Sequence, residues 1–236
     1  GQWIGRCPVN GKQEKMRGGN KMRFLIVSGG EATDEFVENV IKRGGYDVIL
    51  AADSGMDFLY RTKILPDIIV GDFDSVDPEV LEFFREHEEI DICALNPVKD
   101  DTDTEFAIRE SIRRGATEIT IIGGTGTRLD HVLGNISLLG IGLEEDVRME
   151  LLDANNRIRM TDHSVVLKKK KQYGKYLSLL PYSEQVTGAT LKGVKYPLDN
   201  YTMGGFNSLG ISNEIVDEEA SIELKSGRLL VIESRD

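Results

Sequence analysis

The chain has 236 residues, of which 40% are hydrophobic, and its formal net charge is −11. This length allows one large domain or two modest ones, each with its own core. The acidic balance argues against nucleic acid as a partner, because a negative surface repels phosphate backbones. No apolar run approaches the roughly 20 residues that span a bilayer, and no secretory signal is evident, so no membrane association is expected.

Residues 1–21 differ in texture from the rest of the chain, being rich in Gly, Lys and Arg without a hydrophobic period. A buried-strand pattern begins directly after Met22, so we expect residues 1–21 to be an appended leader or a disordered arm. Of the two cysteines, Cys7 lies in this segment and Cys93 lies in an apolar run typical of a buried strand. They form neither a disulfide framework nor a zinc-ligand spacing, which fits a reducing cytoplasm.

Strand and helix patterns alternate from residue 22 to residue 153. This alternation requires crossover connections, which predict an α/β/α three-layer domain with a mostly parallel, six-stranded sheet covered by helices on both faces. In chain order we predict a strand at 23–27, a helix at 34–42, a strand at 48–52, a helix through Phe58 and Leu59, a strand at 68–70, a helix at 78–86, a strand at 90–95, a helix at 104–114, a strand at 118–122, a helix at 132–143 and a strand at 147–152.

Helical periods disappear over residues 154–236. Short apolar runs alternate there with turn signals, which favours a C-terminal antiparallel β-sandwich. The run Lys168–Lys171 is best explained as a solvated strand end that protects a sheet edge. The strands predicted in this region are 164–167, 176–180, 189–191, 221–224 and 229–232.

The acidic motif Gly71-Asp72-Phe73-Asp74-Ser75 follows a predicted strand. Two carboxylates two residues apart can converge on one divalent cation, and Mg²⁺ takes oxygen ligands together with waters and substrate phosphates. The alternative is an ordinary turn, in which Asp and Ser hydrogen-bond to their own backbone. Because ligands bind beyond the carboxyl ends of parallel strands, the position favours Asp72 and Asp74 as metal ligands.

A second acidic motif, Lys99-Asp100-Asp101-Thr102-Asp103-Thr104-Glu105, precedes a predicted helix. Thr102 and Glu105 have the spacing of a capping box, and acids are favourable at a helix N-terminus. These roles do not require four acids within six positions, since crowded carboxylates repel one another unless a cation neutralises them. We therefore expect Asp103 to face a metal.

Two further motifs follow predicted strands. The glycine-rich turn at 123–126, which includes Thr125, would expose backbone N–H groups to phosphate, and Arg128 would add a bidentate phosphate donor. His131 is a candidate base, although a hydrogen-bonding histidine at a helix start is the commoner case. In Ala51-Ala52-Asp53-Ser54-Gly55, the acid would hold a ribose hydroxyl or a base edge, or would cap the following helix.

Together these motifs supply acids for a metal, and glycine turns and an arginine for phosphates. That combination indicates phosphoryl or nucleotidyl transfer, in which catalysis consists mostly of positioning and charge neutralisation. These residues alone do not name the acceptor.

The ordered motifs resemble those of the thiamine pyrophosphokinase family. The resemblance is carried by Ala51–Gly55, Gly71–Ser75, Asp100–Asp103 and Arg128–His131, and by Gly210–Glu214, which is similar to that family's serine–asparagine motif. It extends from Met22 to the end of the chain. Four spaced motifs in the right order are more specific than any one of them.

The resemblance implies a cytoplasmic homodimer with each active site between the two chains. The thiamine hydroxyl would attack the β-phosphorus of ATP, giving thiamine diphosphate and AMP. The resemblance implies that Mg²⁺ is held by Asp72, Asp74 and Asp103. The proton acceptor is left open by the sequence, with Asp103, Asp100 and water as the alternatives. The ATP-contact candidates are Asp53, Ser54, Lys99, Thr102, Thr125, Arg128, Asp130 and His131, and the thiamine candidates are Tyr196, Ser212 and Asn213.

The chain departs from the vertebrate members of the family, which carry an aromatic residue at the position of Thr104 and a tryptophan where Tyr196 would substitute. An alternative interpretation is an enzyme that transfers diphosphate to another hydroxymethyl heterocycle, such as a pterin. A neutral pterin would gain little from acidic surroundings, whereas the thiazolium ring of thiamine is cationic. A third reading is a non-catalytic thiamine or nucleotide sensor, although a sensor has no need of acids that bind a metal.

Overall fold

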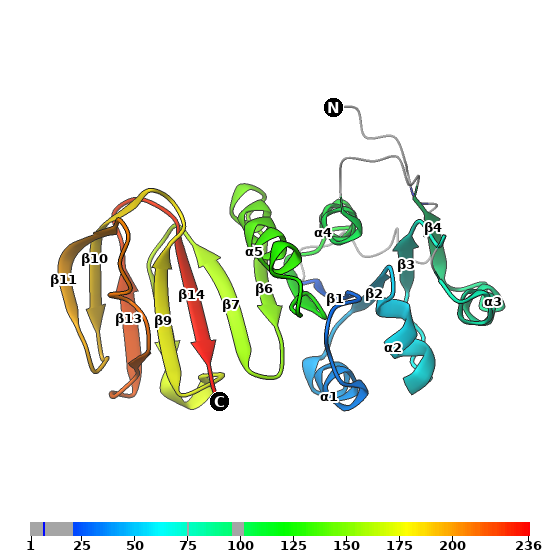
Figure 1. The fold of residues 1–236 in the computed structure, drawn as a ribbon, viewed down its shortest axis with the longest axis horizontal. Coiled ribbons are helices and arrows are strands. Elements are labelled where there is room, and N and C mark those ends of the chain that lie inside the picture. The colour runs from blue at the N-terminus through cyan, green and yellow to red at the C-terminus, as the bar shows by residue number, and fades with distance from the viewer. Residues whose placement is uncertain (1–6, 8–20, 75, 96–101) are drawn as a thin grey trace. The chain divides into compact units, whose positions relative to one another are not determined.

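The computed structural model describes residues 7, 21–74, 76–95 and 102–236. The chain divides into two compact units, residues 1–149 and residues 150–236. Each unit has its own arrangement of strands (Figure 1). Among the described residues, no helix is both long enough and apolar enough to cross a membrane.

Strands and helices alternate through the first unit, which confirms the predicted α/β class. The largest difference is at α5, which begins at residue 129 rather than 132. Leu129 stands at helical spacing from Val132 and Leu133, so the predicted start left out the first turn, in which Leu129 is exposed. The elements are β1 Arg23–Val27, α1 Asp34–Gly44, β2 Val48–Ala52, α2 Gly55–Thr62, β3 Ile68–Gly71, α3 Pro78–Arg85, β4 Asp91–Ala94, α4 Asp103–Arg113, β5 Glu118–Ile122, α5 Leu129–Glu144 and β6 Arg148–Leu152, which contains the boundary between the units.

The sheet of the first unit is mostly parallel, as predicted. Its strand order is β6-β5-β1-β2-β3-β4, and the pairs from β5 to β4 are all parallel. Val27, the last residue of β1, pairs with Ala51 of β2 and Ile122 of β5. The carboxyl ends of these neighbouring strands therefore meet at one edge of the sheet.

The strands form the centre of the core because apolar residues point to both of their faces. Leu25 and Ile26, adjacent residues of β1, are both fully buried. Helices cover the two faces, with α4 and α5 on one side and α1 and α2 on the other (Figure 1). Side-chain caps start several of these helices: the backbone N–H of Phe36 donates to Thr33 Oγ1 before α1, and that of Glu79 donates to Asp77 before α3.

The second unit contains two antiparallel sheets, which agrees with the predicted β-sandwich. One has the order β12-β9-β14-β7, with the last residues of β6 paired to β7, and the other has the order β11-β10-β13-β8. A shared core of alternating residues, such as Leu179, Val186 and Val231, fills the space between them. The strands are β7 Asn156–Thr161, β8 Val165–Lys168, β9 Tyr176–Pro181, β10 Gln185–Lys192, β11 Leu198–Gly204, β12 Asn213–Glu214, β13 Glu219–Glu223 and β14 Leu229–Ser234.

Three of these strands were not expected from the sequence: β7, β11 and β12. In β11, most side chains are exposed, and the run Leu198–Gly204 lacks an apolar alternation that would mark it. It becomes a strand because β10 supplies hydrogen-bonding partners along its length. The basic run follows the prediction: β8 ends at Lys168 at the edge of its sheet, and the exposed short helix η2 (Lys169–Lys171) follows it.

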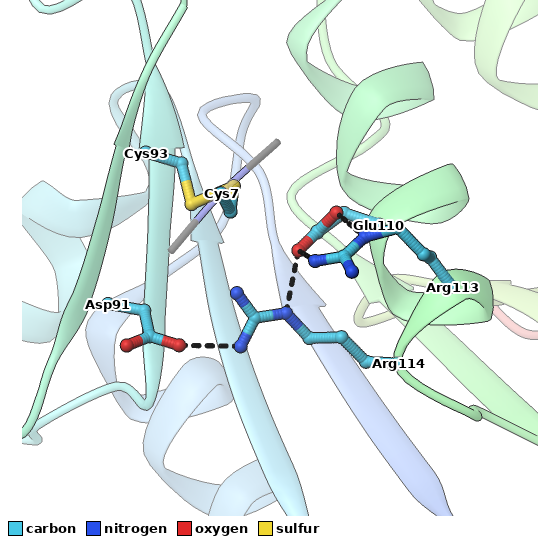
Figure 2. Close-up of a disulfide and its surroundings, with 6 residues drawn as sticks. All are labelled: Cys7, Asp91, Cys93, Glu110, Arg113 and Arg114. Atoms are coloured by element: carbon cyan, nitrogen blue, oxygen red, sulfur yellow. Dashed lines mark hydrogen bonds and ion pairs between the residues drawn. A yellow bond between two sulfur atoms is a disulfide. The ribbon is translucent and has the colours of Figure 1, made fainter. Parts of the chain in front are cut away.

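A disulfide joins Cys7 to Cys93, which makes the expectation of no disulfide framework wrong. Cys93 is buried in β4 as predicted, and Cys7 is also buried. Pairing between cysteines 86 residues apart cannot be deduced from their spacing. Figure 2 shows the bond close to an ion cluster in which Arg114 donates to Asp91 of β4 and Glu110 of α4, at 2.6 and 2.7 Å.

Candidate functional site

The strand order of the first unit creates a switch point between β1 and β5. The chain runs outward from β1 through β2 and β3 to β4, and then α4 returns it to β5 on the opposite side of β1. In open parallel sheets, ligands bind in the crevice beyond the carboxyl ends of the strands at such a point. The turn after β1 and the glycine-rich turn after β5 lie there.

The loops at this edge are packed backbone against backbone. Gly30 N donates to Gly123 O at 2.7 Å, and Glu31 N donates to Thr125 O at 2.9 Å, which continues the β1–β5 pairing beyond the strands. A Cβ atom on Gly123 (φ +66°) would lie 2.1 Å from Ser28 O. One on Gly55 would lie 1.9 Å from Val27 O. Glycine is therefore required for α2 and the 123–126 turn to approach the end of β1.

A cavity of about 630 Å³ opens at this edge. Its volume is within the usual range for small-ligand sites. Residues from the carboxyl ends of β1, β2, β3 and β5 line it, together with the first turns of α4 and α5. The described lining residues are Ser28, Gly29, Gly30, Glu31, Asp53, Ser54, Asp72, Thr102, Asp103, Thr104, Gly123, Gly124, Thr125, Gly126, Thr127, Arg128, His131 and Asn135.

Three aspartates from three different segments line this cavity: Asp53 after β2, Asp72 after β3 and Asp103, the first residue of α4. Asp74 is exposed and is not among the described lining residues. Its backbone N–H donates to Asp72 Oδ1 at 3.2 Å. The loop therefore also contains the turn hydrogen bond that was the alternative to metal binding. That bond leaves Asp72 Oδ2 outside the turn.

The donor set of the cavity fits a hard divalent cation. No group of three or more acidic, histidine or cysteine side chains in the described part of the chain is close enough to enclose a metal by itself. Mg²⁺ is usually held by only one or two carboxylates, together with waters and substrate phosphates. Asp72 and Asp103, which line one cavity, match that incomplete shell.

Asp53 is not the N-cap of the following helix, which was one of the two roles that the sequence allowed for it. The N-cap of α2 is Ser54, whose side chain makes no capping hydrogen bond, and Asp53 adopts φ +51°. Burial raises the pKa of Asp57 in α2. The positive charge of Arg61 lowers that pKa, and the nearby carboxylate of Asp53 raises it further. Asp53 thus contributes negative potential to the cavity wall.

Thr102 caps α4 as predicted. Its Oγ1 accepts a hydrogen bond from Glu105 N at 3.2 Å, and the carboxylate of Glu105 is bound by Arg109 one turn later. The cap sets where α4 begins, so Asp103 and Thr104 in the first turn reach the cavity.

Arg128 and His131 line the cavity, but the guanidinium of Arg128 is already engaged. It binds Asp130 through Nη2–Oδ2 at 2.6 Å and Nε–Oδ1 at 3.2 Å, and both side chains are exposed. This pairing lowers the pKa of Asp130 and raises that of Arg128, so both remain ionised near neutral pH. Asp130 is therefore the partner of Arg128, and it is not among the described lining residues.

Backbone strain marks three of the predicted motifs. Of the six described non-glycine residues with positive φ, Asp53, Phe73 and Ser212 each lie inside one of them. This region of φ is unfavourable for residues with a Cβ and is found mainly where surrounding structure maintains it, often at functional sites.

The thiamine candidates lie in the second unit. Asn213 is buried, and its amide binds the backbone of Tyr196 in both directions: Tyr196 N donates to Asn213 Oδ1 at 3.0 Å, and Asn213 Nδ2 donates to Tyr196 O at 2.8 Å. The ring of Tyr196 is exposed. Ser212 N donates to Ser178 Oγ at 3.0 Å, which anchors the turn that carries both Ser212 and Asn213.

Two of the predicted site residues, Lys99 and Asp100, lie outside the described residues, as does Ser75 of the acidic motif. Conversely, the cavity lining includes residues that were not among the predicted site residues, such as Ser28, Glu31 and Asn135. Asn135 Nδ2 donates to Gly124 O at 2.7 Å, which ties α5 to the glycine-rich turn. Asn135 lies four residues after His131 in α5, so the two side chains share one face of the helix. That spacing could have indicated Asn135 from the sequence.

Two family models match the chain. The model of the thiamin pyrophosphokinase catalytic domain matches residues 43–151, and that of the thiamin pyrophosphokinase vitamin B1 binding domain matches residues 162–229. The first range contains the described cavity residues from Asp53 onward, and the second contains Tyr196, Ser212 and Asn213.

Curated sequences and solved structures of thiamine pyrophosphokinases are also similar to this chain over most of its length. The thiamine pyrophosphokinase of Bacillus subtilis (strain 168) is 34% identical over 190 residues, which are 79% of this chain and 87% of that protein. The crystal structure of the B. subtilis thiamine pyrophosphokinase has a TM-score of 0.81 at 29% identity, covering 91% of this chain and 99% of that chain. That of the Geobacillus thermodenitrificans thiamin pyrophosphokinase has a TM-score of 0.79 at 30% identity, covering 91% and 98%.

Proposed function

The chain belongs to the thiamine pyrophosphokinase family, and we propose that its two units divide that family's reaction between them. The reaction is ATP-dependent formation of thiamine diphosphate. Residues 22–153 bind the nucleotide, and residues 154–236 bind thiamine and contribute to dimerisation. The observation that carries this division is the acidic cavity at the β1–β5 switch point, within the range of the catalytic-domain match.

ATP occupies that cavity in this proposal. Support comes from the cavity lining, which includes five of the ATP-contact candidates: Asp53, Ser54, Thr102, Thr125 and His131. Arg128 also lines it, and its guanidinium can exchange the exposed Asp130 carboxylate for a phosphate at little cost, since exposed ion pairs are weak. Asp130 therefore acts by orienting Arg128.

Mg²⁺ is the proposed metal, held by Asp72 and Asp103 in the cavity and by Asp74 beside it. Bound there, it would neutralise phosphate charge that develops during transfer. Support comes from the carboxylate donor chemistry and the incomplete shell, which leaves positions for phosphate oxygens.

The chain's own residues hold the reactants and accept a proton. The thiamine hydroxyl oxygen forms a bond to the β-phosphorus, and the bond from that phosphorus to the α–β bridging oxygen breaks, with its electron pair leaving on AMP. The hydroxyl proton passes to a carboxylate, Asp103 or Asp100, or to water. Asp103 is favoured by its place in the cavity wall.

Thiamine is proposed to bind at the exposed ring of Tyr196 and at Ser212. A flat aromatic face suits a cationic thiazolium or a pyrimidine ring. Asn213 positions Tyr196, since its amide is engaged by the Tyr196 backbone. The vitamin B1 binding domain match, which contains all three residues, supports this placement.

A cytoplasmic homodimer is the proposed working form. Leu129 and Leu133, in the first two turns of α5, are 70% and 64% exposed, and Ile211 is also exposed. Exposed apolar side chains of this size favour burial in an interface between copies. The cytoplasmic location rests on family resemblance, and the Cys7–Cys93 bond would then have to resist intracellular reductants.

The deciding experiment supplies the purified chain with ATP, thiamine and Mg²⁺. AMP and thiamine diphosphate are the expected products in equal amounts, and a hydroxymethylpterin in place of thiamine should yield neither AMP nor a diphosphate ester. Formation of ADP with a thiamine monophosphate would contradict diphosphate transfer. Binding of both substrates without turnover would instead support a sensor.

A further inference from the structure

Two buried hydroxyl groups meet in the wall of the cavity. Ser28 follows β1, and Thr104 is the second residue of α4; their Oγ and Oγ1 atoms are 3.1 Å apart. Both residues line the cavity, and they are only 9% and 7% exposed. Neither belongs to the site residues expected from the sequence.

The pair has one hydrogen-bond donor more than it uses. Two hydroxyls carry two protons, and the bond between them consumes one. Among the described residues, the structure gives these two side chains no further acceptor. A buried donor without a partner is costly, so the second proton requires an acceptor that enters the cavity.

The surroundings favour an anionic oxygen as that acceptor. Thr104 lies in the first turn of α4, an 11-residue helix, where the helix dipole and backbone N–H groups favour negative charge. Asp103, the adjacent residue, is a proposed ligand of the cation that accompanies phosphate. We propose that the Ser28–Thr104 pair donates a hydrogen bond to a phosphate oxygen of the nucleotide. This inference rests on the proposed use of the cavity for ATP.

Both members of the pair are held by their own elements. Ser28 N donates to Ile122 O at 2.8 Å, which joins it to the end of β5, and Thr102 fixes the first turn of α4. The hydroxyls can reverse the direction of their mutual bond, so either one can present the outward proton. Removal of one hydroxyl leaves the other able to donate but without the partner that orients it, so a single variant weakens the contact and only the double variant removes it.

The test measures binding of ADP and adenosine by calorimetry, so that turnover is not needed. In the Ser28→Ala/Thr104→Val double variant, we expect the Kd for ADP to rise by about 10- to 100-fold, as for a hydrogen bond to a charged group, while the Kd for adenosine changes by less than about twofold. Each single variant should lose less ADP affinity than the double variant. The loss should persist without Mg²⁺, because the pair contacts phosphate directly.

Ser111→Ala is the matched control, because it removes a fully buried hydroxyl from the same helix, where it donates to Ala107 O. It should leave both Kd values unchanged. If the double variant does not fold, Thr104→Ser, which keeps both hydroxyls, should bind ADP like the parent, and Thr104→Val should bind it more weakly than Thr104→Ser.

The proposal is overturned if ADP and adenosine lose affinity equally in the double variant, if ADP affinity is unchanged, or if the loss occurs only with Mg²⁺. Equal binding of ADP by Thr104→Ser and Thr104→Val would also overturn it where the double variant is unfolded. A parent chain that binds no ADP would instead contradict the proposed nucleotide site itself.

Discussion

At the scale of single residues, the acidic loop separates into two positions with different surroundings. Asp72 lines the cavity and accepts a hydrogen bond from Asp74 N, whereas Asp74 is exposed. The carboxylate of Asp72 therefore combines a turn hydrogen bond with a place in the cavity lining. The turn that the sequence presents as the alternative to a metal ligand does not remove this side chain from the cavity.

Asp72→Asn should lower kcat/KM by at least about 100-fold, because the amide keeps the turn hydrogen bond but removes a charge that balances metal and phosphate. The measurement is initial rate against Mg²⁺ concentration, where the variant should need more Mg²⁺. Asp77→Asn is the matched control, since Asp77 accepts from Glu79 N at the start of α3 and is not among the described cavity residues. Turnover close to the parent in Asp72→Asn would refute the metal assignment.

Asn213 is expected to act through Tyr196. Asn213→Asp replaces the N–H donor to Tyr196 O by a carboxylate oxygen, so the two oxygens repel and the ring moves. The KM for thiamine should rise by roughly 10-fold, with the KM for ATP unchanged. Tyr196→Ala should produce a similar rise, and the double variant should be no worse than the more affected single variant. Additive losses would show that Asn213 contacts thiamine independently.

At the scale of elements, a buried ion cluster joins α4 to β4. Arg114 follows α4 and bridges Asp91 of β4 and Glu110 of α4, and all three side chains are almost fully buried (Figure 2). Arg113 binds the same Glu110 from a partly exposed position. The cluster therefore fixes the C-terminal end of the helix whose N-terminal end carries Thr102 and Asp103 into the cavity.

Arg114→Met should reduce the free energy of unfolding by about 3–5 kcal/mol, because it leaves buried carboxylates without their partner. Arg113→Met is the matched control and should cost less than about 1 kcal/mol, since its pair is partly exposed and Glu110 keeps Arg114. Denaturant unfolding of both variants gives the comparison. Equal losses would show that burial of Arg114 does not decide the strength of the cluster.

At the scale of the whole molecule, the Cys7–Cys93 bond attaches the N-terminal segment to β4 of the first unit. A cross-link between distant positions stabilises mainly by restricting the unfolded chain, and the effect increases slowly with the length of the loop. This segment was expected to stand apart from the fold. The bond ties at least its Cys7 position to the core.

Cys93→Ser should reduce the free energy of unfolding by about 2–4 kcal/mol under non-reducing conditions. Cys7→Ser removes the same bond and should cost the same within error, and reductant should lower the stability of the parent but of neither variant. A thiol assay on the denatured, unreduced parent should find no reactive cysteine. Two reactive thiols per chain would contradict the bond.

Local patterns were sufficient for most elements of the first unit. The strands Arg23–Val27, Val48–Ala52 and Glu118–Ile122 follow the predicted boundaries, because a continuous apolar run between turn signals is a local property. The exposed strand β11 could not be predicted in this way. Its form depends on hydrogen bonds to β10, and its own residues show no apolar alternation.

The sequence by itself determined the family, the fold class and the residue types of the site, because motif order and hydrophobic period can be read along the chain. Only the tertiary structure decided which of those residues share a cavity. The return of α4 places β5 beside β1, and Asp53, Asp72 and Asp103 line one cavity there with Ser28 and Thr104. It also pairs Cys7 with Cys93 across 86 positions. Such contacts join segments far apart in the chain, so no local pattern encodes them.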